Sequence, residues 1–197
     1  MPKKILVVLG FLILAAFLYH LDALTGQWRF ERLCKTEGGP RIDERIEKDM
    51  GWYVEEPANG LKSYQTVFAR FKHVAFVRWK DKTGGLFDVY WQPAPRANRY
   101  IAFPDTDFIL RPVDSGKAVR YQYVFERIEL PDNRFGRYQD KIIDLKTGRV
   151  AATFTQFKYQ WTTPDRVILN APTGVSCAFS YEDYRDFSQS IYTIKRK

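Results

Sequence analysis

The first 21 residues constrain this chain more than any other segment. Lys3 and Lys4 precede an uncharged apolar run at residues 5–19 (ILVVLGFLILAAFLY), which His20 and Asp22 close. A run of this length matches both the apolar region of a secretory signal and a short membrane span, and it exceeds what a helix in a small globular domain needs. The sequence therefore predicts that residues 1–22 form an N-terminal membrane anchor or an uncleaved signal, which contacts the membrane through residues 5–21.

Cleavage of this segment is disfavoured, because signal peptidase needs small residues at the first and third positions before the cut. A cut after Ala16 leaves Leu14 at the third position, and a cut after Ala23 leaves Leu21 there. Residues 31–33 before Cys34 are not a lipobox. Because the lysines precede the run, the positive-inside rule predicts a cytoplasmic N-terminus. We expect a single-pass protein of a bacterial inner membrane, with its domain in the periplasm.

The remaining residues, 27–197, have the composition of one folded domain. The chain is 45% hydrophobic and 16% aromatic, which excludes a disordered protein. The formal net charge is +8, and +6 remains when Lys3 and Lys4 are set aside. A basic domain attracts nucleic acid, anionic lipid or an acidic protein. The predicted periplasmic location argues against nucleic acid.

Cys34 and Cys177 are the two cysteines of the chain. In an oxidising compartment, a disulfide between them is the favoured interpretation. The chain-entropy model assigns roughly 4–5 kcal/mol to closing such a long loop. The alternatives are two buried thiols or a reactive Cys34, for which His73 would be the histidine available as a base.

The pattern after the anchor predicts a mainly β (α+β) fold: an antiparallel sheet or small sandwich with one or two peripheral helices. Two hairpins are expected, one formed by residues 73–80 and 86–92, and one at 138–159 in which Gly148 takes a positive φ. Residues 119–125 predict a further strand. Shorter strands are expected at 100–103, 108–110 and 166–170.

Helical periodicity is present in three segments. Residues 41–50 place Ile42, Ile46 and Met50 on one face, and residues 181–191 have apolar positions three and four apart. Both segments predict short helices. Residues 60–72 fit either a helix or a strand, and we favour the strand.

No segment has the signature of a catalytic, metal or cofactor site. Two histidines and two distant cysteines do not match zinc-ligand spacing, and no nucleophile elbow or phosphate-binding glycine loop is present. We therefore expect no cofactor. A carboxylate pair leaves no local signature, so Asp88, Glu126 and Asp144 are the acids to examine first. In the alternative interpretation, Asp88 and Glu126 lie on solvated strand faces and Asp144 stabilises a turn through side-chain hydrogen bonds.

Aromatic residues recur among basic ones, which outside the membrane suggests contact with an acidic protein, an acidic polysaccharide or anionic lipid. The alternative is a sheet with aromatic residues inward and basic residues outward. The candidate contact surface consists of Arg70, Phe71, Lys72, Arg78, Trp79, Lys80, Arg134, Arg137 and Tyr138.

Residues 32–42 (RLCKTEGGPRI), the late Cys177 and the turn at 144–150 follow the apolar run. In these patches the chain resembles small uncharacterised membrane-anchored envelope proteins of bacteria. The resemblance implies envelope placement and cysteine pairing, and it implies no activity.

The leading hypothesis is a non-catalytic periplasmic domain that binds a protein partner. Such a domain would serve as an accessory factor of an envelope or secretion assembly, or as an immunity protein. The alternatives are an envelope enzyme acting on polysaccharide or peptidoglycan, and a domain that docks on anionic lipid.

Overall fold

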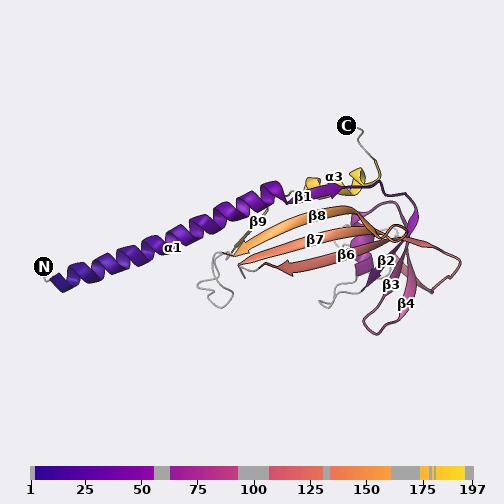
Figure 1. Cartoon of the computed structure of the whole chain (residues 1–197). Coiled ribbons are helices and arrows are strands. Elements are labelled where there is room, and N and C mark those ends of the chain that lie inside the picture. The colour runs from indigo at the N-terminus through magenta and orange to yellow at the C-terminus, as the bar shows by residue number, and fades with distance from the viewer. Residues whose placement is uncertain are drawn as a thin grey trace, which may run out of the picture. The chain divides into compact units, whose positions relative to one another are not determined.

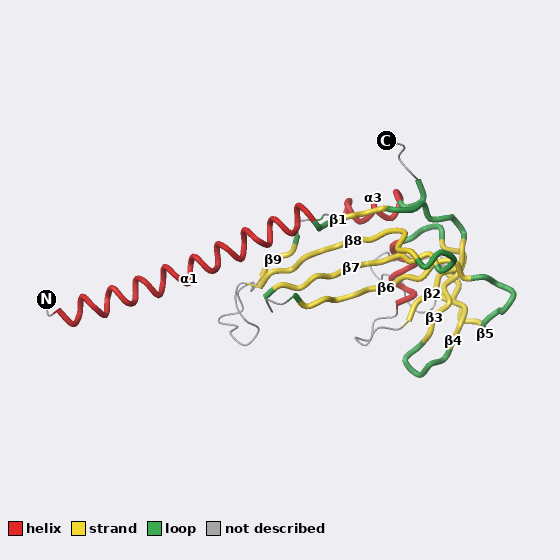
Figure 2. Tube along the Cα trace, viewed as in Figure 1, coloured by secondary structure: helices red, strands yellow, loops and turns green. Residues whose placement is uncertain are grey.

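The computed structural model describes residues 3–55, 63–92, 107–130, 134–160, 174–177, 179 and 181–193. Three helices and nine strands lie in these ranges (Figures 1 and 2). In chain order they are α1 (Lys3–Thr36), β1 (Gly39–Ile42), β2 (Met50–Glu55), α2 (Ser63–Arg70), β3 (Val74–Lys80), β4 (Leu86–Trp91), β5 (Phe108–Pro112), β6 (Val119–Glu129), β7 (Phe135–Asp144), β8 (Arg149–Gln160), β9 (Gly174–Ser176) and α3 (Tyr181–Ser190).

Helix α1 extends over 34 residues and contains the apolar run of the sequence. Within the ranges listed above, none of the helices combines the length and the apolar character required of a membrane span. The predicted membrane helix is therefore unconfirmed.

The nine strands form one mixed sheet, so the prediction of a mainly β fold is confirmed. The strand order is β1-β8-β7-β6-β2-β3-β4-β5, and β9 pairs with β8. The prediction of an antiparallel sheet is wrong for β2, which pairs in parallel with both β3 and β6. Parallel neighbours need a crossover connection instead of a tight turn, so no local turn signal marks them.

The segment at residues 60–72, for which the strand was favoured, contains helix α2. Its buried residues Tyr64, Val67, Phe68 and the adjoining Phe71 are spaced as one helical face. They pack against Trp52 and the other aromatic residues of the main core. Burial of this face outweighs the strand preference of the β-branched and aromatic residues in the segment.

The helix predicted at residues 41–50 is also wrong. Residues 39–42 form β1, which pairs antiparallel with residues 152–155 of β8. The N–H groups of Asp43 and Glu44 then donate to Ala151 O, and that of Ile46 donates to Ile191 O. The apolar side chain of Ile46 is fully buried in the core, without a helix.

The remaining predicted elements in the described ranges are confirmed. Strands β3 and β4 form the first hairpin, and β7 and β8 are neighbours in the second. Gly148 has a φ of 69°, as the predicted turn requires. Strands β5 and β6 and helix α3 match the predictions at 108–110, 119–125 and 181–191. The strands predicted at 100–103 and 166–170 lie outside the described residues.

The chain forms two compact units. Unit 1 comprises residues 1–38, 127–138 and 156–178, and unit 2 comprises residues 39–126, 139–155 and 179–197. Unit 1 therefore contains α1 and the ends of β6, β7 and β8, whereas unit 2 contains the main hydrophobic core.

Candidate functional site

The C-terminal third of α1 is fixed within unit 1 by residues four apart on one helix face. Gly26 lies so close to Tyr159 that an added Cβ would stand 2.1 Å from the tyrosine oxygen. One turn later, the Phe30 ring stacks on the Tyr159 ring at 6.1 Å between centroids. A further turn later, Cys34 forms a disulfide with Cys177. These three contacts hold the helix against the end of β8.

The predicted disulfide is confirmed, and it joins residues 143 positions apart in the sequence. Both cysteines of the chain are consumed by it, so the alternatives of buried thiols and a reactive Cys34 are wrong. Cys177 is 4% exposed, and its sulfur accepts a hydrogen bond from Phe157 N–H. The bridge fixes α1 beside β8.

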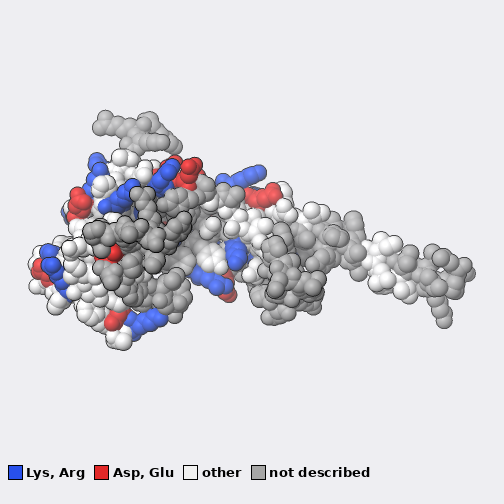
Figure 3. All heavy atoms as spheres, turned by 180° about the vertical axis from the view of Figure 1, so that it is seen from behind, with Lys and Arg blue, Asp and Glu red and all other residues white. Residues whose placement is uncertain are grey.

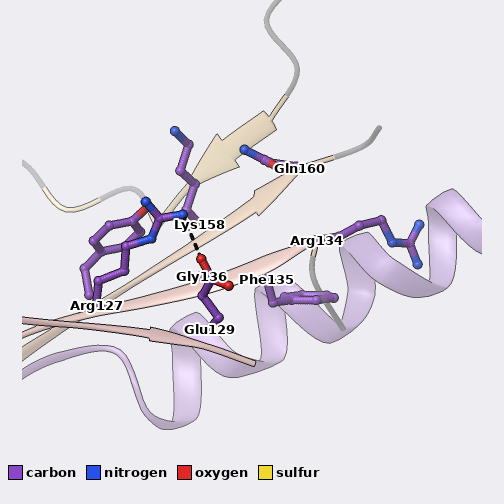
Figure 4. Close-up of a pocket in the computed structure, with 8 residues that line it drawn as sticks. Arg127, Glu129, Arg134, Phe135, Gly136, Lys158 and Gln160 are labelled. Carbon is purple, nitrogen blue, oxygen red and sulfur yellow. Dashed lines mark hydrogen bonds and ion pairs between the residues drawn. The ribbon is translucent and has the colours of Figure 1, made fainter. Parts of the chain in front are cut away.

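A pocket lies beside the contact of α1 with β8, where β6 and β8 end and β7 begins in unit 1 (Figure 4). Its lining includes three cations, Arg127, Arg134 and Lys158, and one acid, Glu129. The Arg127 guanidinium donates to Glu129 Oε1 at 3.2 Å and lies 5.8 Å from the Tyr138 ring centroid. Both partners of that ion pair are more than half exposed, so the pair is solvated and stabilises the fold little. The pocket therefore has an excess of positive charge.

Aromatic rings form the wall between this pocket and α1. Phe135 and Tyr159 stack at 4.8 Å between centroids. The Arg134 guanidinium lies 5.8 Å from the Tyr159 ring, and that of Arg29 lies 5.1 Å from the Phe135 ring. In Figure 4, Arg127 and Arg134 lie on opposite sides of the view, so the cations cover a surface instead of converging on one point. We call Arg29, Arg127, Arg134 and Lys158 the basic end of unit 1.

Of the predicted contact residues, Arg134, Arg137 and Tyr138 lie in unit 1, each partly buried. Arg134 and Tyr138 line the pocket. Sequence reasoning missed Arg29, Arg127 and Lys158, which lie on other elements and join the site only in the folded chain. The interleaving of basic and aromatic residues that marked 134–138 recurs at residues 28–30 and 157–159 and was the available signal.

The predicted contact residues Arg70, Phe71 and Lys72 lie in unit 2. Phe71 is 2% exposed in the core, and Lys72 is exposed. The Arg70 guanidinium donates to the buried Asp140 at 2.5 Å. Asp140 also accepts hydrogen bonds from the hydroxyls of Tyr123 and Tyr184.

This network joins α2, β6, β7 and α3. Burial, followed by the Asp140 charge, raises the pKa of both tyrosines above the ordinary value. The hydroxyls therefore remain donors at neutral pH, and the network is a structural clamp.

Arg78, Trp79 and Lys80 occupy β3 in unit 2. Arg78 makes a two-point ion pair with Asp88, at 2.8 and 3.0 Å, and also donates to the carbonyl of Asp114. Trp79 is partly buried, and its ring meets that of Tyr64 at 5.0 Å between centroids. Lys80 is paired with Glu55 on the surface.

The three acids selected from the sequence each face a cation. Asp88 is fully buried against Arg78, Glu126 pairs with Lys141 at 2.5 Å, and Asp144 pairs with Arg120 at 2.7 Å. Asp144 also accepts a hydrogen bond from Lys146 N–H, the predicted turn-stabilising role. The observed contacts of these carboxylates are thus structural.

One edge of the sheet exposes apolar side chains in unit 2. Strand β5 ends the strand order and, among the described residues, pairs with β4 alone. The pairs Trp91–Phe108 and Val89–Leu110 place Trp91 and Leu110 on the same face. Trp91 is 42% exposed and Leu110 45% exposed. We call Trp91, Leu110 and the outer backbone of β5 the β5 edge.

The described ranges contain no group of three or more His, Cys, Asp or Glu side chains arranged to hold a metal ion. On the face drawn in Figure 3, basic and acidic side chains are interspersed. Comparisons of the chain with protein-family models, with curated proteins and with solved structures find no match. Any assignment of function therefore rests on the surfaces described above.

Proposed function

We propose that this chain is a membrane-anchored, extracytoplasmic binding protein whose β-rich part takes up a protein partner at the β5 edge. In this proposal residues 1–22 hold the chain at a bacterial inner membrane, with the N-terminus in the cytoplasm and the rest in the periplasm. The chain then acts as an accessory factor of an envelope assembly or as an immunity protein, and its part in binding is non-catalytic.

Membrane attachment is supported by the two lysines before the apolar run and by side chains in the middle of that run. Phe11, Leu12, Ile13 and Leu14 are each more than half exposed. Four consecutive residues of a helix point in four directions about 100° apart, so apolar surface faces every side. Such a helix needs an apolar environment around it, which a bilayer provides. The Cys34–Cys177 disulfide is in keeping with an oxidising compartment.

The β5 edge is the observation that carries the partner-binding part of the proposal. An edge strand has backbone N–H and C=O groups along its outer side, and these can pair with an added strand. Beside them, Trp91 and Leu110 offer apolar contact area. Aromatic and apolar anchors next to a pairing edge favour a partner that supplies an extended segment with apolar side chains.

Site-specific crosslinking in intact cells tests this proposal. A photoreactive amino acid at Leu110 should capture one stoichiometric envelope protein. Leu145 is a matched control, because it is 44% exposed against 45% for Leu110 and lies in the turn between β7 and β8. Equal capture at both positions, or recovery of abundant envelope proteins alone, would contradict binding at the β5 edge.

The competing hypothesis of an envelope enzyme gives a different result. If an acid performs chemistry on polysaccharide or peptidoglycan, Glu126→Gln should abolish a cell phenotype while the fold persists. A binding protein should tolerate this change, because Glu126 is partly exposed and its role is one ion pair with Lys141.

A further inference from the structure

We propose that the basic end of unit 1, Arg29, Arg127, Arg134 and Lys158, binds the phosphate headgroups of anionic phospholipids in the leaflet from which α1 emerges. This inference rests on the membrane attachment proposed above. It concerns unit 1 alone and is independent of the partner proposed for the β5 edge.

The contacts between α1 and β8 fix the direction in which the basic end faces. Going backward along α1, Cys34 is bonded to Cys177 beside Phe157, Phe30 stacks on Tyr159, and Gly26 lies against the Tyr159 hydroxyl. The helix therefore approaches the end of β8 as it runs back toward its apolar segment. Arg134, which packs on Tyr159, lies at that same end.

The length of α1 places this end near the membrane surface. With a rise of 1.5 Å per residue, Gly26 lies about 8 Å beyond residue 21. The headgroup layer on each side of the hydrocarbon core is about 5–8 Å thick. Trp28 lies about 10 Å beyond residue 21, and its 65% exposed side chain is long enough to reach back to the interface, where tryptophan is enriched. The basic end thus lies within reach of lipid phosphates when residues 5–21 are in the bilayer.

The charge of unit 1 matches an anionic surface. Its described residues after position 23 include seven Lys or Arg against three Glu. The guanidinium of Arg127 lies over the Tyr138 ring. Those of Arg29 and Arg134 lie over the Phe135 and Tyr159 rings, respectively. A guanidinium orders two parallel N–H donors for phosphate oxygens, and stacking on a ring restricts its motion. Aromatic support therefore prepares these arginines for headgroup contact.

The pocket adds a small recess to this charge. Lys158 and Arg127 border it and are exposed, and Glu129 is the acid in its lining. In Figure 4, the Lys158 side chain extends from β8 away from Gly136 and Glu129. A phosphodiester near Lys158 and Arg127 would meet two cations without displacing a buried ion pair.

Lipid binding to the full chain in a neutral detergent tests the proposal. Native mass spectrometry measures the apparent affinity for short-chain phosphatidylglycerol and, as the uncharged comparison, phosphatidylcholine. We expect preference for phosphatidylglycerol and a steep loss of binding between low and high salt. Each cation near an anionic surface contributes roughly a five-fold factor, so Arg127→Gln, Arg134→Gln and Lys158→Gln together should weaken binding about 100-fold.

The matched control removes three positive charges from unit 2. Lys72→Gln, Lys82→Gln and Lys146→Gln change exposed residues and lower the net charge equally. The control should bind as the unchanged chain does. A second variant with Arg127→Lys and Arg134→Lys keeps the charge and should lose less affinity than the triple Gln variant, because it loses only the paired donors and the ring stacking. Circular dichroism verifies that every variant is folded.

Equal weakening in the control, or equal affinity for the two lipids, would overturn headgroup recognition while leaving membrane attachment intact. A full chain that fractionates away from membranes in cells would instead overturn the attachment, and this inference with it.

Discussion

At the scale of single residues, Asp140 is the shared acceptor of a hydrogen-bond network in unit 2. It is 3% exposed and accepts hydrogen bonds from Arg70, Tyr123 and Tyr184. Replacing it with alanine leaves without their acceptor a guanidinium, the buried hydroxyl of Tyr123 and the partly buried hydroxyl of Tyr184. We expect Asp140→Ala to lower the free energy of unfolding by about 3–5 kcal/mol, measured by urea denaturation.

The matched comparison for Asp140 is Asp43, whose ion pair with Arg41 is exposed. Asp43→Ala should cost less than about 1 kcal/mol. Equal losses for the two variants would mean that the Asp140 network adds nothing beyond a surface pair.

The buried carboxylate of Asp88 predicts that the free energy of unfolding depends on pH in the acidic range. Burial opposes its charge, but the hydrogen bonds and charge of Arg78 and the N–H of Asp114 outweigh burial and hold the pKa below its ordinary value. A lowered pKa in the folded state contributes stability above the unfolded-state pKa, about 3.9, and this contribution is lost as pH falls further. We expect the difference in unfolding free energy between the unchanged chain and Asp88→Asn to shrink from pH 6 to pH 3. A difference that stays constant between pH 6 and pH 3 would contradict this link between the charge of Asp88 and stability.

At the scale of elements, sequence patterns predicted well wherever the determining contacts are local. The hairpin turn at residues 144–148 needs a glycine with positive φ, and Gly148 supplies it. Helix α3 follows from apolar residues three and four apart. The parallel partners of β2 lie far along the chain, and nothing near residues 50–55 encodes them. For α2, the sequence pattern fits both a helix and a strand, and only packing in the tertiary core decides between the two.

The contact of α1 with β8 depends on the absence of a side chain at Gly26. We expect Gly26→Ala to push the helix away from Tyr159, because an added Cβ would stand 2.1 Å from the tyrosine oxygen. Strain of this kind typically costs about 1–3 kcal/mol. Hydrogen exchange should show faster exchange at residues 24–34 in the variant.

Gly10 provides the control for this change, since an added Cβ there has nothing within 4 Å. Gly10→Ala should leave exchange at residues 24–34 unchanged. Unaltered exchange in Gly26→Ala would show that the helix does not depend on close approach at this position.

At the scale of the whole molecule, the sequence predicts the cysteine pair and one residue of the basic end, Arg134. It does not predict how the basic end or the β5 edge is assembled. Arg134 and Tyr138 were found because they are neighbours in sequence. Arg29, Arg127 and Lys158 come from three other segments, and their proximity is a product of the fold of unit 1. The β5 edge was not predicted, because a strand's position at the end of a sheet is set by the strand order and not by its own residues.

The proposed periplasmic location of the chain predicts the oxidation state of its two cysteines. If residues after the anchor are periplasmic, Cys34 and Cys177 are oxidised in living cells. Free thiols can be labelled under denaturing conditions with a maleimide linked to a polymer, which adds one polymer to each thiol. The chain should then carry no polymer before reduction and two polymers after reduction. In cells lacking the periplasmic thiol oxidase, two should appear without reduction. Two free thiols in normal cells would place the domain in a reducing compartment, because the folded geometry itself brings the two sulfurs together.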